Sequence, residues 1–395
     1  MNDTKEKQEK DSNFKNDQFK NLIKLISSDI MLKKLFLTCF IVLLSFVSIM
    51  AQRVLVIDND GMPIPYVTVT TPDGKYIANT DIDGWIENLD GHTTITLSQV
   101  AYKPLTVNLA EVVDGVITME DAEYVLPDVV VKPKELLYVQ TYYRVTQIDE
   151  DGPVYYRAGI IDNTYERAKE KLSIKEKSIS AAESGLLKFT LNTLVGGMIK
   201  DLCKLHKQST YQKVTSNDGK WAHVSVTTDS TGRQVISDSE SVLGYIDEDK
   251  ESGTRTVSLN LWLLNKHRDI ANEKNEKKKD KKQAELEVTE QNSEHSFFEV
   301  YRIDENGHSS IGDFVMQQSL HRGELKRTKK KYILIIESFA TEKAYIDKKE
   351  FKQTRKDNDV DKSYEDMLRY EKAHNIPPLA PHLRTQIDKL FVKEQ

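Results

Sequence analysis

Cysteine is almost absent from this chain of 395 residues, which holds only Cys39 and Cys203. Cys39 lies in a hydrophobic segment that we expect to be removed, so Cys203 would remain alone in the mature protein. An intramolecular disulfide is then excluded, and the fold must be held by its core, for which the length is sufficient. Cys203 follows an apolar stretch, and we interpret it as a buried small hydrophobic residue rather than a reactive thiol.

The sequence also lacks the short motifs that mark common catalytic and nucleotide sites. It contains no H-E-x-x-H zinc motif, no G-x-S-x-G nucleophile elbow and no Walker A loop. His321 and Glu324 form an H-x-x-E fragment, but zinc needs three protein ligands and no third ligand follows at a suitable spacing. We therefore expect no catalytic, cofactor-binding or metal-binding residues, no cofactor and no enzymatic activity.

Positive charge is not in excess. The chain has 56 Lys and Arg against 62 Asp and Glu, a net charge of −6 at pH 7. This acidic balance argues against nucleic acid as a partner. Residues 271–294 are rich in lysine, but acids alternate with the lysines, so we predict an exposed charged insertion there.

One long hydrophobic run is present near the start of the chain. Residues 35–52 carry no charge, follow Lys33 and Lys34, and include a small residue at Ala51. A short basic region, an apolar stretch and a small residue at the end are typical of a signal peptide, which we place at residues 31–51. The alternative is a retained N-terminal anchor that associates with the membrane, for which the run is slightly short.

Residues 1–30 are polar and charged, which is unusual before a signal peptide. We interpret them as an over-extended N-terminus and expect translation to begin at Met31. The signal peptide implies export, so we expect the protein in the periplasm, in the outer membrane or at the cell surface.

Residues 52–132 alternate short β-type runs with glycine turns. Asp-Gly pairs supply the positive φ angles that hairpin turns need, and the runs between them alternate apolar and polar residues. This pattern predicts an antiparallel β-sandwich. The expected strands lie at residues 53–57, 66–70, 75–79, 85–89, 93–98, 105–109 and 129–131.

Four spaced motifs in this region resemble the carboxypeptidase-regulatory-like domain. Residues 61–69 are similar to its G-x-P-(I/L)-x-x-(A/V)-x-V pattern, and residues 80–85 to its T-D-x-x-G-(F/Y/W) pattern. Residues 97–102 are similar to S-x-x-G-Y with Ala101 in place of glycine, and residues 126–131 to L-x-E-V-V-V. The resemblance covers about residues 53–132. It implies a transthyretin-like sandwich that is an accessory module without peptidase activity.

Residues 133–395 predict an α+β region with a β-rich core, which makes the whole chain mainly β. Tyrosines cluster at residues 142–143 and 155–156, and we interpret them as cross-strand pairs in a half-buried sheet, with a binding surface as the alternative. Helices are expected over most of 165–207 and at 364–374 and 382–392. Strands are expected at residues 138–145, 154–161, 221–228, 233–236, 256–264, 297–303, 309–317, 332–336 and 344–346.

These observations favour a non-catalytic envelope protein that binds or scaffolds, with a protein or a glycan of the cell envelope as its partner. The alternative is a hydrolase whose active site cannot be read from the sequence. Nothing in the sequence indicates an oligomeric state.

Overall fold

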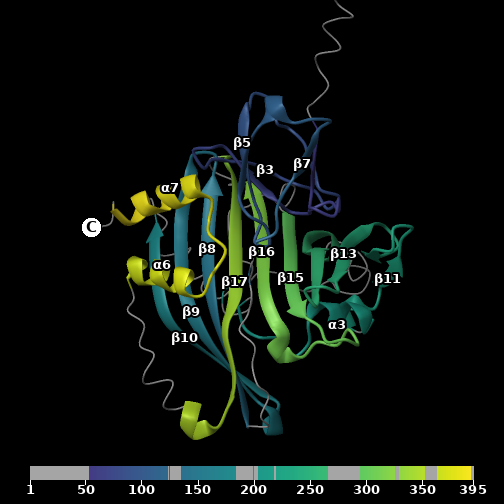
Figure 1. Ribbon diagram of the computed structural model, residues 1–395, viewed down its shortest axis with the longest axis vertical. Helices are drawn as coiled ribbons and strands as arrows, with labels where there is room; N and C mark the ends of the chain where they lie inside the picture. The colour runs from purple at the N-terminus through teal and green to yellow at the C-terminus, as the bar shows by residue number, and fades with distance from the viewer. Residues whose placement is uncertain are drawn as a thin grey trace, which may run out of the picture. The chain divides into compact units, whose positions relative to one another are not determined.

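The computed structural model describes residues 53–122, 124, 135–183, 199, 203–217, 219–265, 294–324, 329–351 and 363–392. Residues Arg53–Gln395 belong to one compact unit. Its fold is mainly β, as expected, and its sheets are almost entirely antiparallel (Figure 1). The predicted signal peptide, the strand at 129–131 and the charged insertion at 271–294 lie outside the described residues.

The N-terminal part consists of two small sheets that enclose one apolar core. One sheet has three strands in the order β4-β1-β7, and the other has four in the order β3-β2-β5-β6. Val56, Val69, Ile86 and Leu97 are among the residues whose side chains share this core. The strands are β1 (Val54–Ile57), β2 (Thr68–Thr70), β3 (Tyr76–Asn79), β4 (Trp85–Ile86), β5 (Thr94–Ser98), β6 (Leu105–Asn108) and β7 (Val116–Thr118).

Strand β7 was not expected from the sequence. Asp114 and Gly115 both adopt positive φ angles and turn the chain, after which Val116–Thr118 pairs in parallel with β1. The Asp-containing turns of this part are closed by hydrogen bonds within the turn. The Asp58 side chain accepts from the amides of Asp60 and Met62, as plain turns require.

The larger sheet has ten strands in the order β10-β9-β8-β17-β16-β15-β14-β13-β12-β11, each antiparallel to its neighbours (Figure 1). Because β17 pairs with β8, a strand near the C-terminus joins two runs of consecutive hairpins. The strands are β8 (Leu136–Asp149), β9 (Gly152–Glu166), β10 (Lys171–Glu183), β11 (Ser225–Thr228), β12 (Gln234–Ser237), β13 (Val242–Asp249), β14 (Thr254–Asn260), β15 (Glu294–Arg302), β16 (Phe314–Glu324) and β17 (Lys331–Ile346).

The helix predicted over most of residues 165–207 is wrong for Lys171–Glu183, which forms β10. This segment pairs with β9 along its whole length. An ion pair of 3.1 Å between Lys177 and Asp162, both buried, fastens the two strands. Local helix propensity is weak enough for such tertiary pairing to override it.

Other expectations about strands also need correction. Strand β13 was not predicted, although it pairs with both β12 and β14. The two strands expected at 332–336 and 344–346 are one continuous strand, β17, interrupted only by a register shift between Ala340 and Glu342. Polar residues inside β17 hid its continuity.

Two helices cover one face of the larger sheet. They are α6 (Tyr364–Ala373) and α7 (Pro381–Val392), close to the predicted bounds, and they lie across β8, β9 and β10 (Figure 1). The Ser363 hydroxyl accepts from the Asp366 amide and so caps α6 at its first turn. We call the covered side of the sheet the helix face.

The tyrosine clusters lie in strands, as expected, but the sheet is fully buried there and the tyrosines are not register partners of one another. Tyr142, Tyr143, Tyr155 and Tyr156 are fully buried. Because side chains alternate along a strand, Tyr142 and Tyr156 lie on the helix face and Tyr143 and Tyr155 on the other face. These side chains are therefore not available as a binding surface.

The two small sheets pack against the larger sheet. Tyr66, Tyr76 and Val100 share the apolar core of the helix face. The Tyr245 hydroxyl of β13 also donates a 2.6 Å hydrogen bond to Asp83. A separate short helix, α3 (Thr210–Thr215), lies near β11 at the other end of the sheet.

Candidate functional site

Three polar side chains form a row across the helix face. Gln318, Glu337 and Arg144 face one another on the adjacent strands β16, β17 and β8. Gln318 donates to Glu337 at 3.3 Å, and Arg144 donates to the other oxygen of Glu337. All three are at most 5% exposed, so this row is a polar element inside an apolar core.

Glu371 of α6 is the centre of a second set of contacts above this row. It accepts a hydrogen bond of 2.6 Å from Tyr142 and one of 2.5 Å from Arg384 of α7. Its carboxylate also lies 3.8 Å from the Arg144 guanidinium, and Tyr156 donates to it at 3.4 Å. The carboxylate thereby joins the sheet to both helices.

Arg144 makes a further contact with the segment between the helices, since its Nη1 donates to the carbonyl oxygen of Pro377 at 2.8 Å. Glu337, Arg144, Glu371 and Arg384 thus alternate in charge and together carry no net charge. We call these four residues the buried charge network. Charges in a core are tolerated when they are paired and hydrogen-bonded in this way.

The pKa values around the network follow from burial and neighbouring charge. Burial alone would lower the pKa of Arg144, but Glu337 and Glu371 outweigh burial and raise it. Burial, with Glu371 nearby, raises the pKa of Tyr156 to about 12. The arginine is therefore charged and the phenol neutral across the physiological pH range.

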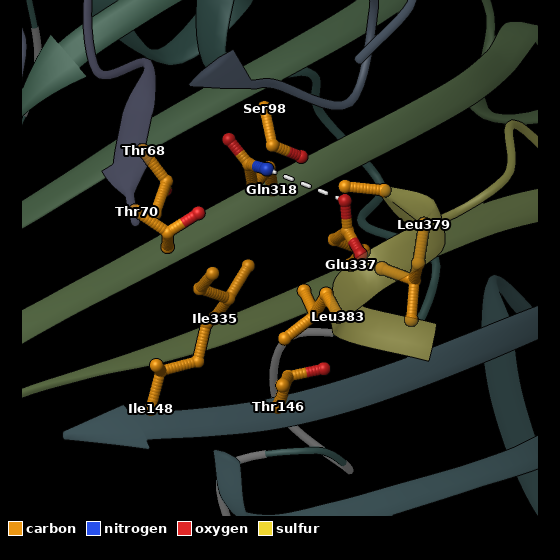
Figure 2. Close-up of a pocket in the computed structure, with 11 residues that line it drawn as sticks. Thr68, Thr70, Ser98, Thr146, Ile148, Gln318, Ile335, Glu337, Leu379 and Leu383 are labelled. Atoms are coloured by element: carbon orange, nitrogen blue, oxygen red, sulfur yellow. Dashed lines mark hydrogen bonds between the residues drawn. The ribbon is translucent and has the colours of Figure 1, made fainter. Parts of the chain in front are cut away.

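A small pocket lies beside Glu337, where the four-stranded small sheet, the larger sheet and the start of α7 meet. Figure 2 shows its side chains, with the hydrogen bond between Gln318 and Glu337. Its interior has room for about one water molecule, which is far smaller than an organic ligand requires. It is lined by Thr68, Thr70, Ser98, Thr146, Ile148, Gln318, Ile335, Glu337, Leu379, Ala380 and Leu383.

Hydroxyl groups and one amide give the pocket a polar side. The Thr146 Oγ1 and Gln318 Oε1 atoms are buried and have no hydrogen-bond partner among the described residues. At the rim, Thr70 Oγ1 lies 3.3 Å from His382 Nε2 of α7. Polar atoms beside a space of this size suit an ordered water.

His321 and Glu324, the zinc-like pair of the sequence, do not converge. They are three residues apart on β16, which points them to opposite faces of the sheet. Glu324 instead approaches Lys329 at 3.6 Å. In the described part of the chain, no three His, Cys, Asp or Glu side chains are placed to share a metal ion.

Cys203 is buried in the core on the face opposite the helices. Burial raises the pKa of its thiol above the ordinary value. This agrees with our interpretation of Cys203 as an inert core residue. Nearby on the same face, Arg157 donates both to Tyr143 at 3.0 Å and to Glu176 at 2.9 Å.

The sequence did not indicate the buried charge network. A usable signal exists in hindsight, because Glu337 interrupts an apolar run in β17 and Arg144 interrupts one in β8. A lone charge within an apolar strand must find a partner in the fold. The partners themselves lie 193 and 229 residues away, in the Arg144–Glu337 and Tyr142–Glu371 contacts.

No helix among the described residues is long and apolar enough to cross a membrane.

Comparison with known proteins finds no matching family model and no matching curated protein. Among solved structures, the chain matches a protein of unknown function of the DUF3598 family from Nostoc punctiforme. That match has 10% identity and a TM-score of 0.14, and covers 70% of this chain and 94% of the other. A likeness at this TM-score carries no argument about fold or function.

Proposed function

We propose that this chain is an exported protein of the bacterial cell envelope that binds or scaffolds a protein or glycan partner and does not catalyse a reaction. Export is supported by the hydrophobic run at residues 35–52 and the basic pair before it. The proposal includes a carboxypeptidase-regulatory-like module of transthyretin-like fold at its N-terminus. The motifs of residues 61–102 and the two small sheets around one core support that module.

The observation that carries the non-catalytic part is the use of the buried charged groups. Carboxylates, arginines and tyrosines are the groups that often perform acid–base chemistry. Here Glu371 and Arg144 bind each other, the sheet and the helices, so they fasten α6 and α7 to β8 and β9. This is the role expected in a rigid scaffold.

Export is tested by the N-terminus of the protein recovered from fractionated cells. Mass spectrometry should find a chain that begins at Gln52, in the envelope fraction. Leu43→Arg places a charge in the apolar run and should keep the protein in the cytoplasm. Val113→Arg, at a position of the mature chain that is 73% exposed, is the matched control and should leave export unchanged. A wild-type chain that keeps residues 31–51 and stays in the cytoplasm would contradict the proposal.

The binding role is tested with the purified mature protein. Affinity capture from solubilised membranes should retain one defined protein or glycan, and a panel of ester, phosphate, glycoside and peptide substrates should show no turnover. Glu337→Gln removes one partner of the buried Arg144 ion pair and should lower the melting temperature, which would support a structural role for this carboxylate. Turnover of any substrate of the panel by the folded wild-type protein would show that the hydrolase alternative is correct.

A further inference from the structure

Two histidines form a stacked pair across neighbouring strands of the larger sheet. His295 of β15 and His321 of β16 are direct register partners. Their ring centroids are 3.8 Å apart and their planes are inclined by 23°. They lie on the face of the sheet opposite the helices and away from the buried charge network.

The two imidazoles point the same ring nitrogen at one place. The hydroxyl oxygen of Ser319 lies 2.9 Å from His295 Nε2 and 3.2 Å from His321 Nε2. Ser319 is 1% exposed, whereas both histidines are partly exposed. Two imidazole nitrogens and an oxygen therefore converge at one point beside two partly exposed rings.

We propose that His295 and His321 chelate one divalent first-row transition-metal ion, such as Zn²⁺ or Cu²⁺, through their Nε2 atoms, with the Ser319 hydroxyl beside the ion. Imidazole is a preferred ligand of both ions. The ion would connect β15 to β16. This site is independent of the proposed envelope function.

The positions of the two Nε2 atoms suit such an ion once the rings open. Zinc–imidazole bonds are about 2.0–2.1 Å long, so two nitrogens on one tetrahedral ion lie about 3.3 Å apart. The rings are already 3.8 Å apart and their nitrogens already face a shared oxygen. Rotation of the two rings out of their stacked arrangement would bring both nitrogens to the ion. Water molecules would fill the remaining coordination positions.

Two protein nitrogens make a weaker site than the three or four ligands of established zinc sites. The expected behaviour is thus reversible binding of one ion. By mass action, such binding raises the melting temperature as the metal concentration increases. The competing interpretation is a purely structural pair in which Ser319 donates to one imidazole and accepts from the other.

The test uses the untagged mature protein, freed of metal by a chelator and titrated with Zn²⁺ or Cu²⁺. Calorimetry should show one equivalent bound, and Zn²⁺ should raise the melting temperature by several degrees. Both effects should disappear in His295→Asn and in His321→Asn. His308→Asn is the matched control, because the His308 side chain is 79% exposed on a turn, and it should bind as the wild type does.

A second measurement does not depend on the variants' folding. Electron paramagnetic resonance of the wild-type protein with one equivalent of Cu²⁺ should show hyperfine coupling to two imidazole nitrogens. The proposal is overturned if the spectrum shows no such pair, or if the wild-type protein binds no stoichiometric metal. It is also overturned if folded His295→Asn and His321→Asn proteins still bind one equivalent.

Discussion

The Tyr142 hydroxyl donates a 2.6 Å hydrogen bond to the carboxylate of Glu371, 229 residues later in the chain. Tyr142 belongs to β8, the strand of the larger sheet that comes first along the chain, and Glu371 belongs to α6, a helix near the C-terminus. Arg144, two residues after Tyr142 on the same face, lies 3.8 Å from the same carboxylate. One acidic side chain thus receives contacts from strand β8 and fixes helix α6 on the sheet.

Replacing Glu371 with glutamine should destabilise the protein strongly. The change preserves the volume of the side chain but removes the charge that Arg144 and Arg384 share. Breaking a buried ion pair by removing one partner costs about 3–5 kcal/mol, because the remaining charge stays buried. Urea unfolding should show this loss.

Glu365→Gln is the matched control, because Glu365 lies on the exposed side of the same helix. It should change the unfolding free energy by less than about 0.5 kcal/mol. Equal effects of the two changes would mean that the network contributes nothing specific.

Gly159→Ala should disrupt the packing of Tyr143 between β8 and β9. A Cβ atom at Gly159 would lie 2.5 Å from the carbonyl oxygen of Ser178 and 2.6 Å from the Tyr143 hydroxyl. Because the backbone of Ser178 cannot move away cheaply, we expect a loss of about 1–3 kcal/mol in unfolding free energy.

Gly312→Ala is the matched control for Gly159→Ala. Its nearest neighbour would be the Lys343 side chain, at 2.9 Å, which is flexible and partly exposed. Its melting temperature should stay close to that of the wild type. A Gly159→Ala protein as stable as the control would show that Tyr143 does not need a glycine opposite it.

Features that depend on neighbouring residues could be predicted from the sequence, whereas contacts between residues far apart in the chain could not. The hairpin of β15 and β16 was visible because Asn306-Gly307 lies between two apolar runs, and α6 and α7 because their apolar residues recur at helical spacing. Strand β10 could not be predicted from the sequence, because its lysines and glutamates suit a helix and only pairing with β9 makes it a strand. The histidine pair was equally hidden. His295 and His321 are 26 positions apart, and only the β15–β16 register places their rings together.

Cys203 should not react with a thiol reagent in the folded mature protein. Its side chain is buried, and burial raises the pKa of the thiol, so little nucleophilic thiolate is present at pH 8. Ellman's reagent should detect one thiol only after unfolding in guanidinium chloride, and reductant should leave the melting temperature unchanged. Rapid labelling of the native protein would show that Cys203 is accessible.

Glu299 should make stability depend on pH in a defined direction. Its side chain is 1% exposed, and burial raises the pKa of its carboxyl despite bonds from the Thr210 amide and the Tyr301 hydroxyl. A folded-state pKa above the unfolded value means that the stabilising contribution is present at low pH. That contribution is lost as the pH rises through the folded pKa.

Glu299→Gln isolates this effect from the other carboxylates. Glutamine stays neutral, so in urea unfolding experiments the stability of the wild type relative to this variant should fall as the pH rises above the ordinary pKa of a glutamate. A difference between the two proteins that does not change with pH, or that grows in favour of the wild type, would contradict a raised pKa.

The N-terminal part, residues 52–134, should fold when expressed alone, but less stably than within the whole chain. It has its own apolar core, which includes Val56, Val69 and Leu97. Tyr66 and Tyr76, however, are buried against the larger sheet and would become exposed. A fragment of about 80 residues is marginal without disulfides, and the loss of this interface removes part of its buried apolar area.

Circular dichroism of the fragment should show a β-type spectrum that melts below the transition of the full protein. Replacing both tyrosines with serine in the fragment should improve its solubility without removing that spectrum, because neither side chain belongs to its own core. A fragment without ordered structure would show that its strands depend on the larger sheet and that both parts form one domain.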